Sequence, residues 1–170
     1  MVIVDTEALD WEETDRGETR FRRKQPAAVA QERRGDGQDD PDIGCSLYEL
    51  PPGSKSWPYH YHEGNAEAMY VLSGEGQVRI DGDVHRIEEG AYVHVPPGEA
   101  GAHRVINDSE EPLRYLAVST MREPDVTVYP DSGKIGVFGG SPPGGREERT
   151  VSGYYRRDDD VSYWEGEEGT

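Results

Sequence analysis

The sequence feature with the clearest chemical potential is a pair of histidines separated by one residue. His60 and His62 are followed by Glu67, five residues further along the chain. In a β-strand, residues i and i+2 point to the same face, so both imidazoles would project into one space. A third histidine, His103, comes after two more turns rich in Gly and Pro. Three histidines and one carboxylate make a ligand set suited to a divalent transition metal.

The segments that must position these residues have the pattern of short strands separated by turns. Apolar and β-prone runs end at Gly and Pro clusters such as 51–53, 74–76 and 96–98. No segment of 43–121 has the apolar repeat of an amphipathic helix over three turns. Regularly spaced short strands therefore predict an all-β sandwich or barrel. The expected strands are residues 43–50, 67–73, 77–81, 84–88, 91–95, 101–106 and 112–120.

Both ends of the chain are more polar than its middle, which predicts three parts. These are a polar N-terminal arm over 1–42, a β-barrel over 43–121, and a C-terminal extension with an acidic tail over 122–170.

Each end also carries a local pattern. Residues 31–41 are charged and contain Gly and Pro, which predicts an exposed loop. Residues 125–129 and 134–138 are expected to add short strands after the barrel. The last stretch is acidic but contains Tyr154, Tyr155, Tyr163 and Trp164, so we expect it to pack on some surface.

The charge balance limits the partners that this protein could have. Its formal net charge is −17, from 35 acidic and 18 basic residues, which disfavours nucleic acid and anionic membrane surfaces. Strong acidity with only three lysines resembles proteins of salt-loving organisms, because high salt screens the self-repulsion of such a charge. The alternative is an ordinary acidic domain with acidic tails.

The single cysteine and the N-terminal segment bear on redox chemistry and on targeting. Cys45 is the only cysteine, so neither an internal disulfide nor a thiolate metal cluster is expected, and its predicted role is that of a small buried residue. The N-terminus lacks a basic and an apolar signal region, and no run approaches the roughly 20 apolar residues that span a bilayer. A cytoplasmic protein is the default expectation.

The spacing of the histidines resembles the two motifs of the cupin superfamily. The first family motif is a glycine, a His-x-His pair, a glutamate and a second glycine, and it is matched by Gly53, His60, His62, Glu67 and Gly74. The second is matched by Gly90, Pro96, Gly98, His103 and Asn107, with four residues between Gly98 and His103 where the family has two. The two motifs cover roughly a third of the chain.

This resemblance implies a cupin-type double-stranded β-helix, or jelly-roll barrel, with His60, His62, Glu67 and His103 as metal ligands. Cupins commonly pair, and the terminal segments carry aromatic residues, so we also expect a homodimer. A narrower resemblance is to uncharacterised single-domain cupins with segments similar to 46–53, 113–121 and 123–134. Neither resemblance implies a reaction, because the fold hosts many unrelated functions.

Each proposed ligand has an alternative role that needs no metal. His60 and His62 could line the barrel and be held by hydrogen bonds to buried polar groups. Glu67 could be an exposed strand carboxylate, and His103 could lie outside the ligand set. Metal ligation is favoured because a neutral imidazole offers one lone pair to a metal, and the partner ligands stand at the family offsets.

The ligand set leaves one or two coordination positions for another molecule. Without a thiolate it suits Mn, Fe, Ni, Co or Zn. We expect a metal-binding protein that acts on or binds a small polar organic molecule, as an isomerase, dioxygenase, decarboxylase or lyase. No general base separate from the ligands is evident. The alternatives are a non-catalytic sugar- or metabolite-binding module or sensor, and a structural or interaction protein.

Residues outside the ligand set receive weaker predictions. His85 is expected at the surface, whereas His94 could face either the cavity or solvent. Met69 and Val71 share the parity of Glu67 and should form an apolar wall beside the metal. The remaining candidates for substrate contact are polar residues on core strands, for which packing or a surface position is the alternative: Tyr48, Arg114 and Tyr115.

Overall fold

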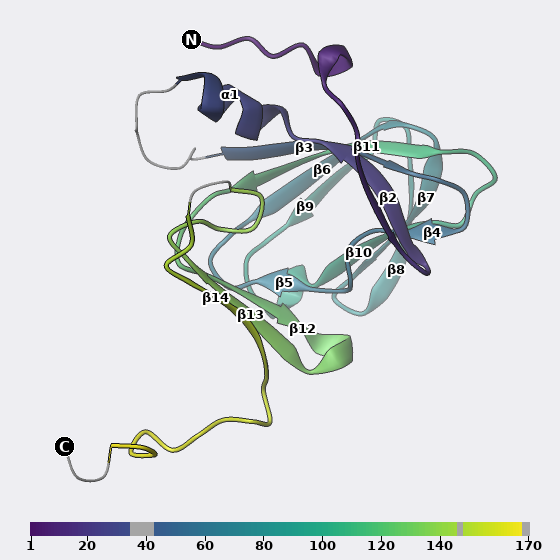
Figure 1. The fold of residues 1–170 in the computed structure, drawn as a ribbon. Helices are drawn as coiled ribbons and strands as arrows, with labels where there is room; N and C mark the ends of the chain where they lie inside the picture. The colour runs from purple at the N-terminus through teal and green to yellow at the C-terminus, as the bar shows by residue number, and fades with distance from the viewer. Residues whose placement is uncertain (35–42, 146–147, 168–170) are drawn as a thin grey trace.

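The computed structural model describes residues 1–34, 43–145 and 148–167 of the 170-residue chain. Strands dominate this part of the chain, and its only α-helix is α1 (Pro26–Arg34), which is accompanied by short turns of 3-10 helix. The predicted all-β class is confirmed, and the curled sheet is that of a cupin-type double-stranded β-helix (Figure 1).

The larger sheet has ten strands, nine of which follow one path in the order β8-β7-β10-β4-β2-β3-β11-β6-β9, while β1 pairs with β2. Most neighbours are antiparallel, but β2 and β4 run parallel. The strands are β1 (Glu12–Arg16), β2 (Thr19–Lys24), β3 (Ile43–Leu50), β4 (Ser54–Lys55), β6 (Glu67–Ser73), β7 (Glu75–Ile80), β8 (Asp83–Glu88), β9 (Tyr92–Val95), β10 (His103–Asn107) and β11 (Leu113–Thr120).

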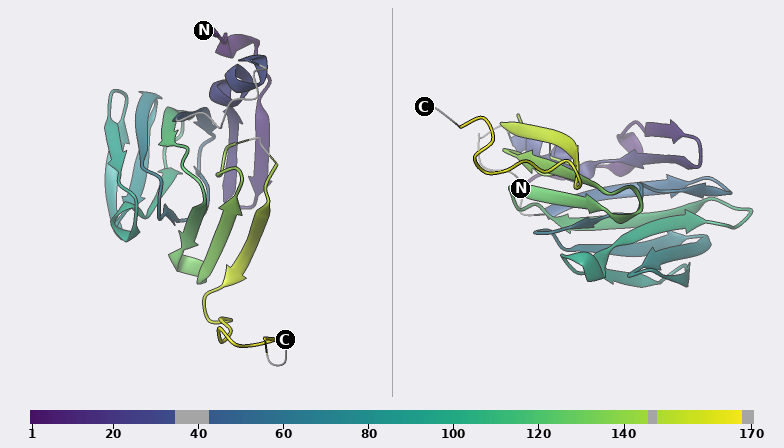
Figure 2. Two further views of the ribbon diagram at one scale, coloured as in Figure 1. Left: turned by 90° about the vertical axis from the view of Figure 1, so that its left-hand side faces the viewer. Right: turned by 90° about the horizontal axis from the view of Figure 1, so that it is seen from below.

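The smaller sheet has four strands in the order β14-β13-β12-β5. They are β5 (Tyr61–His62), β12 (Asp125–Tyr129), β13 (Lys134–Gly139) and β14 (Val151–Arg156). Figure 2 shows these strands as a group beside the larger sheet. Because β5 lies in the His-x-His segment, the C-terminal strands pair directly with the chain that carries the predicted ligands.

Alternation along the strands gives each sheet one buried face. On β10, His103, Val105 and Asn107 are buried while the residues between them are half-buried. Met69 and Val71 of β6 belong to the main core cluster, and neither is among the residues that line the cavity, so their predicted place in a wall beside the metal stays a prediction. This cluster consists of Phe21, Tyr48, Leu50, Met69, Val71, Val78, Ile87, Val95, Val105, Leu113 and Tyr115.

The turn between β6 and β7 shows why the sequence needs a glycine there. Gly74 has a φ of +83°, a conformation that L-residues with a side chain rarely adopt. A Cβ at this position would also overlap the carbonyl oxygen of Pro112. The first motif therefore ends with a glycine because the chain entering β11 passes the turn at close range.

The N-terminal residues contribute to the sheet as well as to a polar surface. β2 pairs with both β3 and β4, and α1 packs against β3. The exposed loop expected over 31–41 is wrong for its first part, because Gln31–Arg34 complete the helix after the apolar run at 27–30. The rest of that predicted loop lies outside the described residues.

The C-terminal strands agree with the prediction for 125–129 and 134–138. The expected packing of the last stretch is confirmed for Tyr154, which contacts Tyr129 and Phe138, but not for its last two aromatic residues. Tyr163 and Trp164 are 84% and 68% exposed, and they contact each other edge to face at 4.9 Å. Figure 1 shows this segment leading away from the sheets. None of the described helices combines the length and the apolar character needed to cross a membrane.

Candidate metal centre

Three strands bring the predicted ligands together. His60 immediately precedes β5, His62 lies in β5, Glu67 begins β6, and His103 begins β10. A two-way backbone bridge joins His60 to His103: each amide donates to the other residue's carbonyl oxygen, at 3.2 and 2.8 Å. The first and second motifs are thereby paired at the point where their histidines meet.

The side chains converge on one point. His60, His62 and Glu67 each offer a ligand atom within 4.8 Å of the other two, so they form a group that could hold a metal ion. His103 is not part of that tight group, but its Nε2 lies 3.0 Å from Glu67 Oε2. The rings of His60 and His103 are 4.7 Å apart between centroids. The longer segment between Gly98 and His103 therefore still leaves this imidazole at the cluster.

Each imidazole is anchored through the nitrogen that faces away from the cluster. His60 Nδ1 lies 2.8 Å from the Pro58 carbonyl oxygen, and His103 Nδ1 lies 2.9 Å from that of Gly101. A carbonyl oxygen only accepts, so both Nδ1 atoms carry the proton in the neutral rings, which leaves each Nε2 with a lone pair. In metal sites, a hydrogen bond from the ring nitrogen that does not bind the metal usually orients the histidine in this way.

Asp125 performs the same task for His62. Its Oδ2 lies 2.7 Å from His62 Nδ1 and also accepts from Thr127 Oγ1 at 2.9 Å. Its Oδ1 accepts from Asn65 Nδ2 at 2.8 Å. Asp125 is fully buried, so its carboxylate is held in a fixed orientation by three donors.

Glu67 supplies the strongest indication that the cluster fits a cation. Its Oε2 is buried and has no hydrogen-bond donor in the described structure, although His103 Nε2 is close. With Nδ1 protonated, that Nε2 presents a lone pair to the carboxylate, and two lone pairs at 3.0 Å need a cation between or beside them. A proton or a divalent metal would satisfy both atoms, and the donor set of three imidazoles and one carboxylate fits a metal.

The electrostatics favour the ligand forms of two of these residues. Burial and the charges of His103 and His62 lower the pKa of His60 to about 3, so its imidazole is neutral near pH 7. Burial alone would raise the pKa of Glu67. When the rings are protonated instead, a hydrogen bond from His103 and the charges of the three histidines lower this pKa to about 2 and keep the carboxylate ionised. Burial also opposes protonation of His62, yet Asp125 and Glu67 outweigh it and raise the pKa of that ring.

The cluster opens into a cavity of about 270 Å³. The barrel contributes one part of its wall through strands β3 and β11, and Tyr48 and the half-buried Cys45 are among the lining residues. The terminal segments contribute the rest: Gln25, Ala28 and Gln31 from the N-terminal side, and Phe138, Arg149 and Tyr154 from the C-terminal side. A molecule bound beside the cluster would thus contact both extensions.

Several residues outside the ligand set lie apart from this cavity. His85 and His94 are exposed, so the predicted surface position of His85 is correct and His94 faces solvent. Arg114 binds Glu49 at 2.6 Å on an exposed face, away from the cavity lining. Tyr115 is buried and stacks on Tyr48 at 5.1 Å, which makes it a packing residue.

The predicted site residues did not include Asp125, Asn65 or Arg149. Asp125 lies 63 residues from His62, and Arg149 follows the Gly/Pro-rich segment 139–145. Short-range spacing cannot reveal such contacts, because they depend on how β12 pairs with β5. The one local signal for Asp125 is its place at the start of a predicted strand.

Comparison with known proteins agrees with this geometry. Residues 46–119 match the profile of the family described as "Cupin domain". An oxalate-binding protein of Thermotoga maritima is 39% identical over 70 residues, which are 41% of this chain and 55% of that protein. An uncharacterized protein of Methanocaldococcus jannaschii is 30% identical over 70 residues, which are 41% of this chain and 54% of that protein. The matched segment thus spans only about half of the length of either curated relative.

Solved structures show the same fold over more of the chain. A sugar phosphate isomerase from a cupin superfamily of Silicibacter pomeroyi aligns with a TM-score of 0.72 and 20% identity, covering 95% of this chain and 98% of that one. A predicted oxalate decarboxylase from Thermotoga maritima aligns with a TM-score of 0.59 and 24% identity, covering 70% of this chain and 98% of that one. Residues 46–119 thus match a cupin domain, and these solved structures share the fold of the chain.

Proposed function

We propose that this protein is a metal-binding cupin that binds or transforms a small polar organic molecule in the cavity beside its histidine cluster. The observation that carries this proposal is the buried, donorless Glu67 Oε2 facing imidazoles whose other nitrogens are already engaged. The ligands are His60, His62, Glu67 and His103. A bound divalent metal would supply Lewis acidity and a position for an oxygen ligand of the substrate.

The chain's own residues have definable roles in this proposal. Pro58, Gly101 and Asp125 hold the three imidazoles in the tautomer that binds metal. Trp57 donates to the Tyr48 hydroxyl at 3.1 Å and closes one side of the cavity. The oxalate-binding relative is consistent with a small organic acid as ligand, although its similarity covers 41% of this chain.

Metal analysis of the purified protein tests the metal site. We expect about one Mn, Fe, Ni, Co or Zn ion per chain, which of them depending on supply. His60→Ala combined with His103→Ala should abolish stoichiometric binding. His85→Ala with His94→Ala is the matched control, because both of these histidines are exposed and should leave the metal content unchanged. A wild-type protein that binds no divalent metal at native salt would contradict the proposal.

A second experiment distinguishes an enzyme from a binding module. Turnover is measured against polyols, sugars and small acids with Fe(II), Mn, Ni and Zn, together with binding by calorimetry. An isomerase, dioxygenase, decarboxylase or lyase activity would require a proton-transfer group. Besides the proposed ligands, the described cavity lining offers the hydroxyl groups of Tyr48, Tyr129 and Tyr154 for this role. Saturable binding without turnover would favour the non-catalytic sugar or metabolite sensor.

We also propose that the acidic surface is an adaptation to high salt. The net charge of −17 repels itself unless it is screened, so the melting temperature should rise from low to molar KCl. A melting temperature that stays constant or falls over this range would identify an ordinary acidic domain.

A homodimer is part of the same proposal. Val161, Tyr163 and Trp164 are exposed on the C-terminal segment, where a second copy could cover them. Size-exclusion chromatography with light scattering at high salt should give twice the 19.0 kDa mass of one chain. A monomer under these conditions would exclude it.

A further inference from the structure

A continuous wall of aromatic rings leads from the metal centre to an arginine. His60 stacks on Tyr129 with 5.9 Å between centroids, and Tyr129 is followed by Tyr154 at 6.1 Å. Tyr154 meets Phe138 at 5.7 Å, and the Arg149 guanidinium lies 4.7 Å from the centre of the Phe138 ring. All of these residues line the same cavity.

Carbonyl oxygens fix the guanidinium of Arg149 in place. Its Nε donates to the Ser141 carbonyl oxygen at 2.9 Å, and one terminal nitrogen donates to that of Pro142 at 3.2 Å. Within the described residues, no carboxylate pairs with it. Carbonyl groups orient the side chain and leave its charge and its remaining N–H donors for another anion.

The described lining of the cavity does not share the strong negative charge of the protein. The chain has 35 acidic residues, yet Glu67 is the only one among the described residues that line the cavity. Arg149 and Arg23 are the two permanent cations of this described lining, and Arg23 is paired with Glu12 at 3.2 Å. With a divalent metal on the ligand cluster, the cavity would carry a clear excess of positive charge inside a strongly negative molecule.

We propose that the natural ligand is an elongated organic anion that coordinates the metal through oxygen at one end and places a carboxylate or phosphate against Arg149 at the other. This inference rests on the proposed metal function and names the ligand class for the same cavity. The body of the ligand lies along Tyr129, Tyr154 and Phe138, which offer stacking faces to a ring or to the C–H groups of a polyol. A two-carbon acid such as oxalate does not extend along a wall of three rings, so it contacts one end only.

The test uses probes that share one body and differ in charge. Sorbitol, gluconate and sorbitol 6-phosphate all carry a six-carbon chain of hydroxyl groups, and oxalate serves as a short anion. Calorimetry is performed on the metal-loaded full chain. One of the two anionic polyol derivatives should bind at least about tenfold more tightly than sorbitol, since charge-assisted hydrogen bonds to arginine are the strong ones. If gluconate binds more tightly than sorbitol 6-phosphate, the anionic group is a carboxylate; the reverse order indicates a phosphate.

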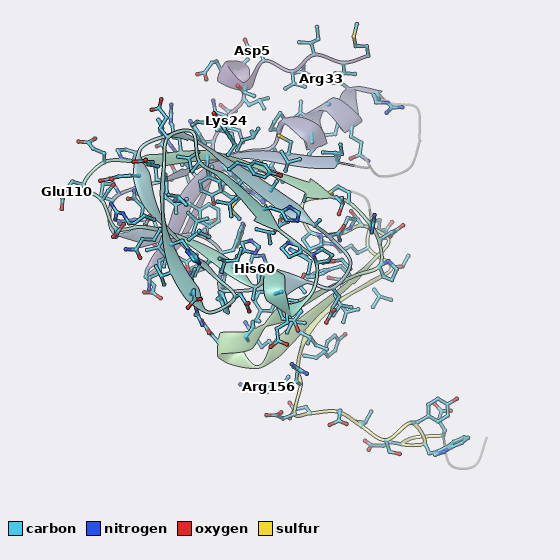
Figure 3. The ribbon with its side chains drawn as sticks, turned by 180° about the vertical axis from the view of Figure 1, so that it is seen from behind. Asp5, Lys24, Arg33, His60, Glu110 and Arg156 are labelled. Carbon is cyan, nitrogen blue, oxygen red and sulfur yellow. The ribbon has the colours of Figure 1, made fainter. Side chains whose placement is uncertain are left out.

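Arg149→Gln should lower the affinity for the preferred anion by about tenfold to a hundredfold and leave the affinities for sorbitol and oxalate unchanged. Arg149→Lys keeps the charge but cannot donate two parallel hydrogen bonds. Its affinity for the preferred anion should therefore lie between those of the wild type and Arg149→Gln. Arg156→Gln is the matched control, because Arg156 is exposed on β14 and Figure 3 shows it well apart from His60, on the outside of the molecule. A melting curve for each variant shows that it folds.

The outcomes separate this inference from the proposed metal function. Normal metal content in Arg149→Gln together with selective loss of anion binding supports the inference. Anion binding that depends on Arg149 in a wild-type protein without metal also supports the anion subsite, while it contradicts the metal function. Equal affinities for sorbitol and its anionic relatives, no binding of any probe, or an unchanged affinity in Arg149→Gln would overturn the inference.

Discussion

The two ends of the cavity are built by different means. At the metal end, His60 and His62 lie at β5 and His103 begins β10, and a hydrogen bond holds each ring from behind. At the arginine end, Phe138, Arg149 and Tyr154 come from the C-terminal strands and the segment between them. The first end is formed by close pairing of the two histidine motifs, whereas the second is formed by segments that follow the barrel in sequence.

This difference indicates how chemistry and selectivity are divided in the molecule. The metal end has the geometry that a reactive or ligand-binding metal needs, and it depends on the packing of the barrel. In our proposal, the arginine end selects the charge of the molecule that approaches the metal. Asp125 connects them, since it begins a C-terminal strand but orients a metal ligand.

The largest effect should come from the carboxylate at the metal end. Glu67→Gln preserves the shape of the side chain but removes its charge, so metal affinity should fall by more than the roughly 10–100-fold that loss of a supporting contact costs. Competition with a chelator of known affinity measures this change. If Glu67→Gln retained full metal affinity, Glu67 Oε2 would not be a metal ligand, and the assignment of this end of the cavity to a metal would be wrong.

The second effect tests the residue that joins the two ends. Asp125→Asn can still accept a hydrogen bond from His62 Nδ1, but it removes the charge that polarises the ring. Metal affinity should therefore fall by about 10–100-fold. Asp131→Asn is the control, because Asp131 pairs with Arg79 on an exposed face. If the two variants bind metal equally well, Asp125 has only a structural role.

A third prediction concerns acid stability of the metal-free protein. The pKa of His60 is about 3 in the folded chain against an ordinary value of 6.5, so the unfolded chain binds a proton in this window that the folded chain does not. Stability should thus be greatest above pH 6.5 and fall as the pH decreases toward 3, by about 1–2 kcal/mol between pH 7 and pH 5. Below pH 4.5, the ordinary pKa of a glutamate, the lowered pKa of Glu67 adds to this loss of stability. The raised pKa of His62 has the opposite effect, because the folded chain then binds a proton more readily than the unfolded chain.

Urea unfolding at several pH values measures this dependence. His60→Gln removes the largest contribution and should flatten the decline between pH 7 and pH 5. An identical decline in the variant would show that other groups cause the acid sensitivity.

The smallest effect is expected along the aromatic wall. Tyr129→Leu retains an apolar side chain but removes the ring between His60 and Tyr154, so affinity for an anionic polyol should fall about three- to tenfold. Metal affinity should stay unchanged, because Tyr129 contacts only the ring face of His60. A loss of metal in Tyr129→Leu would mean that the wall supports the metal end and that the two ends are not separable.

The sequence predicted the features that depend on local spacing. Alternation, glycine-bounded turns and the absence of helical periodicity in 43–121 indicated the β-fold, and the structure confirmed it. The His-x-His pair faces one site because β5 and the residue before it place both imidazoles on one side, and β10 returns His103 to them. The first relation follows from the strand period, which short stretches of sequence encode. The second was expected only from the resemblance of the two motifs to a known family, because His60 and His103 meet through long-range pairing.

The tertiary structure decided what surrounds that site. Asp125 reaches His62 only because β12 pairs with β5, and Arg149 reaches the cavity only because β13 and β14 continue that sheet. It also decided that the tail carrying Tyr163 and Trp164 extends away from the chain, and that Gln31–Arg34 are helical. Residues far apart in sequence meet through long-range pairing whose register no local pattern specifies. The sequence by itself therefore determined the fold and a metal-binding pattern, while the orientation of the ligands and the charge of the cavity arose from the assembled sheets.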